Sequence, residues 1–500
     1  MSLDNSAALP NSPVSFLGKV RQFLWPIYGE ENKRFLPMML MIAFIIFNYT
    51  ILRNIKDALI VTEAGAETIT FLKFWAVVPA AFIFFLFYSK MTNILSSKKV
   101  FYVMILPFIA FFAVFALFLY PNRAMLHPTE SADWLQTALP AGLSGMVAIY
   151  RYWTFSVFYV LAELWGSVVL SLLFWQFANS VTPVAEAKRF YPHLYLLGNV
   201  ANMLAGYITY YFSNLGKTSS AADPWQVSLN YLMLIVVCVG LATTAIYFYL
   251  SRFVFKDAPV AVGAAKKKKP KLSMVESFKF LLSSKYLGLI AVLVITYGIS
   301  INLVEVSWKN RLGMQYPDKN DYNAFMGMLS GTIGFATVVV ILLGGSIIRK
   351  FGWKKGALAT PYILGFTGIT FFACVIFPDF FAPVAFLMGT TPLMMAVMFG
   401  FAQNVLSKST KYALFDPTKE MAYIPLDDVS KSKGKAAVDV VGARLGKSGG
   451  SLLQQFMFAF IGPIGIIMPY SAAIMVIVVA VWIFAVYALS KRFTAISGDK

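Results

Sequence analysis

The stretch YWTFSVFYVLAELWGSVVLSLLFWQF, residues 152–177, contains a single charged residue, Glu163, in an otherwise apolar and aromatic run. A run of this length crosses the hydrocarbon core of a bilayer as a helix, which needs about 20 apolar residues. Similar runs recur along the 500-residue chain, which is 59% hydrophobic and 13% charged, whereas soluble domains are about a quarter charged. Alternating segments of about ten residues, typical of a membrane β-barrel, do not occur. The sequence therefore predicts an all-α integral membrane protein.

The apolar runs predict twelve membrane-spanning helices. They lie at residues 35–62, 69–88, 100–120, 150–178, 193–213, 228–250, 286–308, 322–348, 357–377, 382–406, 450–468 and 471–490. Between the sixth and seventh, residues 251–285 contain four consecutive lysines and predict a cytoplasmic linker that contacts anionic lipid headgroups. This linker separates two six-helix halves, residues 35–250 and 286–490. A cytoplasmic lead-in at 1–34 and a cytoplasmic tail at 491–500 complete the predicted organisation.

The two halves show a weak internal similarity. LYLLGNVANMLAG at the start of the fifth helix resembles GARLGKSGGSLLQQ at the start of the eleventh, and this alignment pairs Asn199 with Lys447. Lys56 in the first helix and Lys309 in the seventh are separated by nearly the same period. Repeated halves are typical of secondary transporters, which bind their substrate near the bilayer midplane between the halves.

The basic residues predict the orientation of the chain. If both termini are cytoplasmic, 33 of the 42 lysine and arginine residues fall in seven cytoplasmic segments. That asymmetry is the positive-inside pattern of membrane proteins. Because the net charge of +19 is spread over seven segments and not one face, it does not indicate a nucleic-acid partner.

Among the charged side chains within the predicted spans or at their edges, five are candidate site residues. Each costs at least about 2.5 kcal/mol at the bilayer centre and therefore needs a partner or a wet cavity. Arg53 and Lys56 share one face of the first helix, and Glu163 has no basic residue within four positions. Glu305 and Lys309, four residues apart in the seventh helix, either pair with each other or face a ligand. The excess of cations predicts a pathway for a multiply charged anion.

The stretch DVVGARLGKSGG, residues 439–450, is similar to a phosphate-binding loop. A Walker A loop needs four residues between its first glycine and the Gly-Lys pair, and the segment from Gly442 to Gly446 supplies only three. Because the stretch precedes the eleventh helix, we expect its glycines and the helix N-terminus to approach a phosphate, with Lys447 adding a positive charge. In the alternative interpretation, Lys447 only anchors the helix at the lipid headgroups.

Aromatic residues cluster at the start of the fourth helix and offer a stacking surface for a flat base. They are Tyr150, Tyr152, Trp153, Phe155 and Tyr159. With 16% aromatic residues in the chain, some clustering of this kind is expected by composition alone.

An enzyme active site is not predicted. The two histidines, His127 and His193, fall on opposite sides of the membrane in this topology, which excludes a histidine metal site. Asp427 and Asp428 are the best acid–base candidates, and no second acidic motif accompanies them. We therefore expect a transporter without a metal or another cofactor.

Five segments together resemble the ATP/ADP translocases of obligate intracellular bacteria and plant plastids. They are RNIKDALIVT, LAELWGSVV, NLVEVSWKN, KEMAYIPLDDVSKSKGKAAVDVV and LGKSGGSL. The resemblance extends from about residue 30 to 490, and the combination of segments is highly specific. The resemblance implies a major-facilitator-like fold of twelve helices. It also implies a protein that imports ATP in exchange for ADP, with phosphate accompanying ADP.

The resemblance also implies site residues. The charged positions of the family fall here on Lys56, Glu163, Glu305 and Lys447, while Arg444 stands where a small or polar residue is expected. The complete predicted substrate site contains Arg53, Lys56, Glu163, Asn199, Glu305, Lys309 and Lys447.

Two alternatives within the family stay open, because some of its members couple nucleotide uptake to protons and others exchange NAD for ADP. We expect a monomer. The first 34 residues do not have the composition of a plastid presequence, which favours a bacterial inner membrane.

Overall fold

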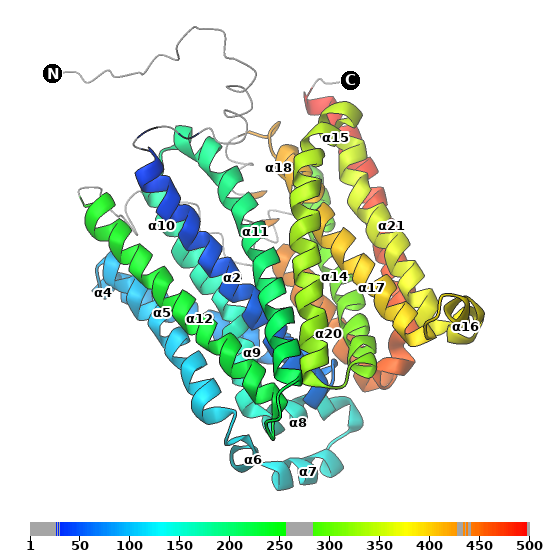
Figure 1. Cartoon of the computed structure of the whole chain (residues 1–500). Coiled ribbons are helices and arrows are strands. Elements are labelled where there is room, and N and C mark those ends of the chain that lie inside the picture. The colour runs from blue at the N-terminus through cyan, green and yellow to red at the C-terminus, as the bar shows by residue number, and fades with distance from the viewer. Residues whose placement is uncertain are drawn as a thin grey trace, which may run out of the picture.

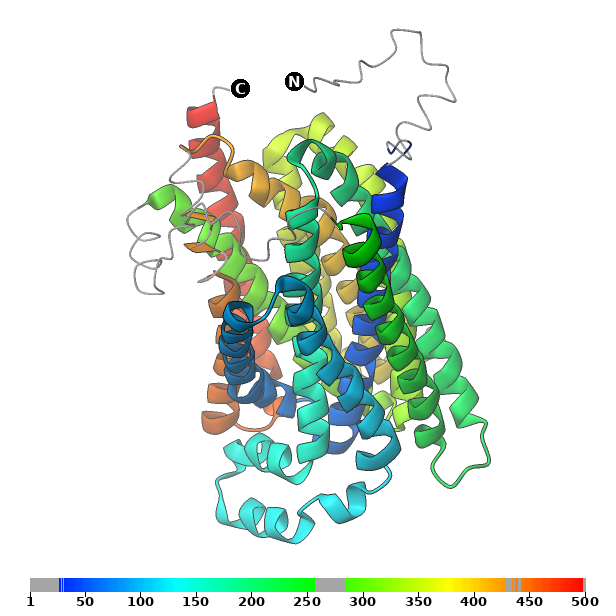
Figure 2. The same ribbon diagram turned by 90° about the vertical axis from the view of Figure 1, so that its left-hand side faces the viewer.

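The computed structural model describes residues 27, 29, 31–256, 284–427, 434, 435, 437, 438 and 442–497, and all secondary structure among them is helical. The helices run side by side in an elongated bundle (Figure 1). Residues 31–254, here called the first helix group, occupy its left side in that view, and residues 285–497, the second helix group, occupy its right side. The first and last described helices begin and end at one end of the bundle, which we call the terminal face. The short helices α6 and α7 mark the opposite end, the far face (Figures 1 and 2).

The first helix group consists of long helices joined by short ones. Its elements are α2 (Glu31–Ala64), α3 (Thr68–Phe71), η1 (Leu72–Val77), α4 (Val78–Ile94), α5 (Ser97–Val114), η2 (Phe115–Leu119), α6 (Arg123–Leu126), α7 (Thr129–Ala138), η3 (Ala141–Leu143), α8 (Ser144–Arg151), α9 (Trp153–Leu164), η4 (Trp165–Phe174), α10 (Trp175–Val181), α11 (Val184–Lys217), α12 (Pro224–Tyr249) and η5 (Leu250–Val254).

The second helix group also consists of long helices joined by shorter ones. Its elements are α14 (Lys285–Gln315), α15 (Lys319–Ile376), α16 (Pro378–Leu387), α17 (Pro392–Thr410), η6 (Lys411–Phe415), α18 (Asp416–Ala422), α20 (Ala443–Phe460) and α21 (Ile464–Ser497). The long α15 is two helices joined at a kink, where Gly352 has a left-handed backbone.

Within the described residues, nine helices are long and apolar enough to cross a membrane, and the bent pair α16–α17 makes a tenth. The helices α11 and α20 run among them in the bundle but carry more polar residues. Counted with these two, the described bundle is consistent with the twelve predicted spans. The chain is a multi-pass membrane protein.

The predicted tenth helix, 382–406, is wrong at both ends. The chain bends by 90° between α16 and the segment that starts at Pro392, so the span begins there. Thr391 caps the new helix by accepting a hydrogen bond from the backbone N–H of Met394 at 3.1 Å. At the other end, the residues predicted as the start of a loop, 407–422, are helical. The charges that suggested a loop are neutralised there, since Lys411 pairs with Asp416 at 2.7 Å.

The boundary between the last two helices is also wrong. It was predicted at Pro469, but α20 ends at Phe460 and α21 begins at Ile464. Gly462 has a φ of 134°, which only glycine adopts readily, and this residue ends the helix. Pro469 lies inside α21. Membrane helices tolerate an internal proline because neighbouring groups satisfy the freed carbonyl.

The two helix groups approach each other most closely where α11 crosses α15. A Cβ atom added to Gly206 would lie 2.5 Å from the carbonyl oxygen of Gly327, and one added to Gly327 would lie 2.7 Å from that of Gly206. Backbone therefore lies directly against backbone, as small residues allow at helix interfaces in membranes. This contact fixes the distance between the groups around the polar residues described below.

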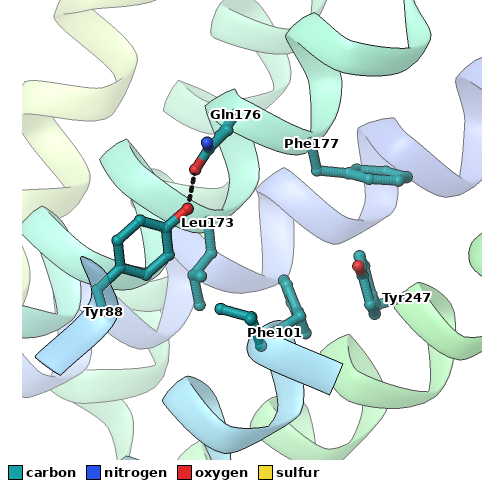
Figure 3. A pocket seen from close by; sticks show the side chains of 7 residues that line it. Tyr88, Phe101, Leu173, Gln176, Phe177 and Tyr247 are labelled. Atoms are coloured by element: carbon teal, nitrogen blue, oxygen red, sulfur yellow. Dashed lines mark hydrogen bonds between the residues drawn. The ribbon is translucent and has the colours of Figure 1, made fainter. Parts of the chain in front are cut away.

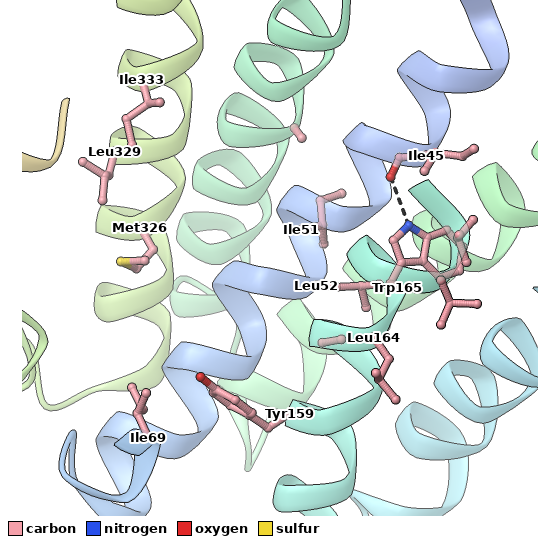
Figure 4. Close-up of a cluster of buried hydrophobic side chains, with 14 of the residues drawn as sticks. Ile45, Ile51, Leu52, Ile69, Tyr159, Leu164, Trp165, Met326, Leu329 and Ile333 are labelled. Atoms are coloured by element: carbon pink, nitrogen blue, oxygen red, sulfur yellow. Dashed lines mark hydrogen bonds between the residues drawn. The ribbon is translucent and has the colours of Figure 1, made fainter. Parts of the chain in front are cut away.

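The core of the first group is apolar and aromatic. Figure 4 shows Trp165 of η4 directed at α2, where its indole N–H donates to the carbonyl oxygen of Ile45 at 3.0 Å. A small cavity beside this core is lined by Tyr88, Phe101 and Tyr247 among others (Figure 3). Its volume of about 10 Å³ suits at most one water molecule, so it is not a substrate site.

Candidate substrate site between the two helix groups

Lys56 lies in the middle of α2 and is 2% exposed. Its ammonium group contacts two carboxylates, Asp57 at 2.8 Å and Glu163 of α9 at 2.9 Å. The ring of Tyr159 lies 3.9 Å from the Lys56 nitrogen and adds a cation–π contact. The structure thus brings together two predicted site residues, Lys56 and Glu163, that are far apart in sequence.

Asp57 joins the two helix groups. One of its oxygens accepts from Lys56, and the other contacts the ammonium group of Lys309 in α14 at 2.9 Å. Lys309 also pairs with Glu305 at 3.3 Å, the contact expected from their spacing of four residues. The Asp57 contact is shorter and crosses between the groups. The interpretation of Glu305 and Lys309 as a pair satisfied only by each other is therefore wrong.

Glu305 is surrounded by three lysines. Besides Lys309, its carboxylate contacts Lys408 of α17 at 3.6 Å and Lys73 of η1 at 3.7 Å. Lys73 also donates to the side-chain oxygen of Asn302 at 3.0 Å. Since Lys73 belongs to the first group and Glu305 to the second, this is another ion pair across the interface.

Arg53 lies one turn closer to the terminal face on α2. Its guanidinium group donates to the hydroxyl of Ser330 in α15 at 3.4 Å, and that hydroxyl donates to Asn54 at 3.0 Å. The guanidinium group also lies 5.9 Å from the ring centre of Tyr49. Arg53 therefore faces the same interface as Lys56, but its contact there is a neutral hydroxyl.

The formal charges of this cluster do not balance. It contains five cations and three carboxylates, which leaves two positive charges without a counterpart inside it. The cations are Arg53, Lys56, Lys73, Lys309 and Lys408, and the carboxylates are Asp57, Glu163 and Glu305. A surplus of positive charge between two helix groups in a membrane suits an anionic ligand.

Asn199 lies on α11, but its amide donates to the carbonyl oxygen of Tyr195 at 3.0 Å, within its own helix. Asn202, three residues further along α11, reaches across the interface beside the charged cluster. Its amide nitrogen donates to the carbonyl oxygen of Ser330 at 3.1 Å, and its oxygen accepts from Thr50 at 2.7 Å. The role predicted for Asn199 stays a prediction.

Lys447 lies in α20 by its backbone, and its side chain is outside the described residues. The helix α20 begins at Ala443, four residues before Lys447, and its N-cap residue Gly442 has helical dihedral angles of −64° and −48°. Gly446 serves helix packing, since a Cβ atom there would lie 3.1 Å from the Cα of Gly298 in α14. The phosphate contact predicted for Lys447 and the start of this helix stays a prediction.

The aromatic cluster predicted to stack a base lies mostly elsewhere. Tyr152 and Phe155 stack on each other and surround the ring of His127 near the far face. Tyr150 and Trp153 contact residues of that same region. Only Tyr159 reaches the charged cluster, where Lys56 covers its ring.

Three members of the cluster, Asp57, Lys73 and Lys408, are absent from the site predicted from the sequence. Asp57 directly follows Lys56 and is itself a charge inside a span, so the cost of burying it was an available signal. Lys73 was placed at the edge of a predicted helix, and Lys408 was assigned to a loop. No local pattern shows that both lysines meet Glu305, because these contacts link distant parts of the chain.

Contacts across the groups close the far face. Lys319 of α15 pairs with Glu63 of α2, and Lys217 of α11 pairs with Asp321 of α15 at 2.6 Å. At the terminal face, the described ion pairs of α2 connect it to α11, its neighbour in the first group, as in the 3.2 Å pair between Arg34 and Glu186. The charged cluster is therefore sealed toward the far face by bonds that must break if the groups separate there.

The fold is shared with known transporters. The chain superposes on a bacterial homologue of the iron transporter ferroportin with a TM-score of 0.56, at 14% identity and with 92% of this chain and 98% of that chain covered. A mutant of the nucleoside transporter NupG gives a TM-score of 0.55 at 12% identity, with 90% and 98% covered. The predicted all-α, major-facilitator-like fold is confirmed.

Sequence comparisons place the chain more narrowly. The chain is 52% identical over 490 residues to "ADP,ATP carrier protein 1" of Chlamydia trachomatis serovar D, with 97% of this chain and 93% of that protein covered. It is 42% identical to the protein of that name in Rickettsia bellii, with 96% and 97% covered. It is 48% identical to the chloroplastic "ADP,ATP carrier protein 1" of Arabidopsis thaliana, with 95% and 76% covered. The family model "TLC ATP/ADP transporter" matches residues 11–493. A buried cationic cluster between two helix groups and these full-length matches agree: the chain belongs to the TLC ATP/ADP transporter family.

Proposed function

We propose that this chain is an antiporter that imports ATP in exchange for ADP, with phosphate accompanying ADP, by alternating access between two six-helix halves. The observation that carries the proposal is the cluster of five cations and three carboxylates at the interface of the helix groups, in which Lys56, Asp57 and Lys309 are buried and the others are partly buried. The names of the relatives, which are ADP,ATP carriers, supply the substrates.

The phosphates of the nucleotide replace carboxylates as partners of the lysines. Lys56 and Lys309 both contact Asp57, and a phosphate group placed between them offers the same charge with more acceptor atoms. Lys73 and Lys408 lie around Glu305 on the other side of Lys309 and bind further phosphate oxygens. Arg53 and Lys447 add charge at the edge of the site.

The carboxylates keep the empty site neutral enough to exist in a membrane. Breaking a buried ion pair and leaving one charge uncompensated costs about 3–5 kcal/mol. When the nucleotide leaves, Glu163 and Glu305 hold Lys56 and Lys309, and the groups stay linked through Asp57. The empty carrier therefore reorients slowly, and transport proceeds as exchange. ATP carries one more negative charge than ADP, so co-transported phosphate bears on the charge balance of each cycle.

The distribution of basic residues predicts the orientation of the chain in its membrane. We infer that both termini and the linker at 251–285 are cytoplasmic, because 33 of the 42 basic residues then lie on the cytoplasmic side. We also infer a monomer in a bacterial inner membrane. The terminal face is the cytoplasmic face in this proposal. The chain catalyses no reaction on the nucleotide, in keeping with relatives that are named as carriers.

Purified protein in liposomes tests the proposal. Labelled ATP is offered to vesicles loaded with ADP, to empty vesicles, and to empty vesicles with an inward proton gradient. Exchange predicts uptake only with internal ADP. Uptake into empty vesicles driven by the proton gradient would contradict it and favour a proton-coupled nucleotide symporter. Uptake that requires internal ADP but favours NAD over ATP would favour an NAD/ADP exchanger.

A further inference from the structure

Each of three helices that line the interface carries a tyrosine on the terminal-face side of the polar cluster. In α2, Tyr49 precedes Arg53 by four residues and Lys56 by seven, spacings that put all three side chains on one helix face. The ring of Tyr49 lies against Gly166, one turn beyond Glu163, where a Cβ atom would be 2.8 Å from the ring. Tyr49 therefore borders the cluster directly.

The same arrangement occurs on α11. Tyr195 precedes Asn202 by seven residues, and Asn202 bonds across the interface to Ser330. Trp175 stacks on one side of Tyr195, with ring centres 5.1 Å apart and an angle of 28° between the planes. Tyr195 is nevertheless 55% exposed. One face of its ring is thus supported from behind while much of the side chain is free.

The third tyrosine comes from the second helix group. Tyr412 of η6 follows Lys408 by four residues, so it lies on the face that meets Glu305 and is one turn closer to the terminal face. It is 50% exposed, and the ammonium group of Lys411 lies 4.5 Å from its ring centre. Tyr49 and Tyr195 of the first group and Tyr412 of the second therefore each lie one or two helical turns on the terminal-face side of a residue that bonds at the interface.

We propose that Tyr49, Tyr195 and Tyr412 form the site for the nucleobase, with the base stacked between the two helix groups and the phosphates directed into the lysines below. Exposed aromatic rings supported at the back are suited to stacking a flat base. Tyr49 and Lys56 are seven positions apart, which is about 10 Å along the helix, a spacing that suits a nucleotide lying along α2. This inference rests on the proposed function.

The test measures ATP uptake into ADP-loaded liposomes for Tyr412→Ala and Tyr195→Ala, with inorganic tripolyphosphate as a base-free competitor. Loss of one stacking partner raises the half-saturation concentration for ATP about tenfold, while the tripolyphosphate concentration that halves uptake is unchanged. Tyr412→Phe and Tyr195→Phe keep the ring and stay within about twofold of the wild type. Tyr207→Ala is the matched control, because this exposed tyrosine of α11 lies off the face shared by Tyr195 and Asn202.

Wild-type half-saturation in the alanine variants would overturn the base site, and so would an equal loss of ATP and tripolyphosphate binding. Failure of tripolyphosphate to compete in the wild type would also overturn it. If an alanine variant does not fold, photolabelling of the wild type with 2-azido-ATP decides: the label falls on peptides containing the three tyrosines or the inference is wrong. No ATP uptake by the wild type would instead remove the proposed function itself.

Discussion

At the scale of single residues, Glu305 has the largest number of cationic neighbours in the described cluster, with Lys73, Lys309 and Lys408 between 3.3 and 3.7 Å. One carboxylate cannot neutralise three ammonium groups. The shortage is the local basis for anion binding, because a phosphate provides the negative charge that the side chains lack. The stability of this site should therefore depend on whether the ligand is present.

Glu305→Gln tests that dependence. Lys73 and Lys408 lose their described carboxylate partner in this variant, and we expect the free energy of unfolding of the empty protein to fall by about 3 kcal/mol. Saturating ATP should restore more stability to the variant than to the wild type, measured as the rise in Tm in detergent. Glu420→Gln is the control, because Glu420 pairs with Lys435 at the surface and both are nearly half exposed. An equal rise in Tm for variant and wild type would contradict the assignment.

Lys56→Ala tests the proposed phosphate contact. The variant leaves Glu163 without its partner and removes a cation from the centre of the cluster. We expect ATP uptake to fall to background in ADP-loaded liposomes while the protein inserts normally into the membrane. Undiminished uptake would show that Lys56 does not bind the substrate.

The sequence predicted part of this site for a clear physical reason. A charge inside an apolar run is costly, so Lys56, Glu163 and Glu305 could be recognised individually. Which of them pair could not be read from the sequence, since Lys56 and Glu163 lie on different helices. Lys408 was missed because a lysine near a helix end is equally compatible with a loop.

At the scale of helices, close packing of α11 on α15 sets the width of the interface. Gly206 and Gly327 place backbone against backbone, and no side chain larger than hydrogen fits between them. The length of the apolar runs was enough to predict that these helices exist. The break before α17 was not predicted, although Thr391 followed by Pro392 is a helix-start signal.

Gly206→Leu tests the packing of these helices. The added side chain collides with the backbone of α15, and overpacking of this kind costs about 1–3 kcal/mol. We expect a lower Tm and reduced exchange, because the groups can no longer close at the far face. Gly465→Ala in α21 is the control, since a Cβ atom there meets no atom within 4 Å. A Gly206→Leu protein with wild-type Tm and exchange would contradict this description of the interface.

At the scale of the whole molecule, the two helix groups are held together by few charged links. Asp57 with Lys309 and Lys73 with Glu305 connect them at the cluster. Lys319 with Glu63 and Lys217 with Asp321 connect them at the far face. The division into two six-helix halves, which the repeat of Lys56 and Lys309 suggests, stays a prediction. The link through Asp57 could not be predicted, because it depends on how the two groups are docked.

Asp57→Asn weakens the contact between the two helix groups but leaves Lys56 and Lys309 each with a carboxylate partner. Lys56 keeps Glu163 and Lys309 keeps Glu305, so the only ionic link between the groups that the variant loses is the one between Asp57 and Lys309. We expect the empty carrier to reorient faster, and labelled ATP should then enter liposomes that contain no ADP. Asp416→Asn is the control, because it breaks an ion pair within one group. Strict dependence on internal ADP in Asp57→Asn would show that this link does not restrain the empty carrier.

A structure of the protein in lipid nanodiscs with bound ATP, determined by cryo-electron microscopy, would locate the nucleotide. We expect the triphosphate within hydrogen-bonding distance of Lys56 and Lys309, in the position where Asp57 now joins them, and the base among Tyr49, Tyr195 and Tyr412. ATP bound elsewhere, with the contacts of Asp57 to both lysines intact, would contradict the assignment of the cluster as the substrate site.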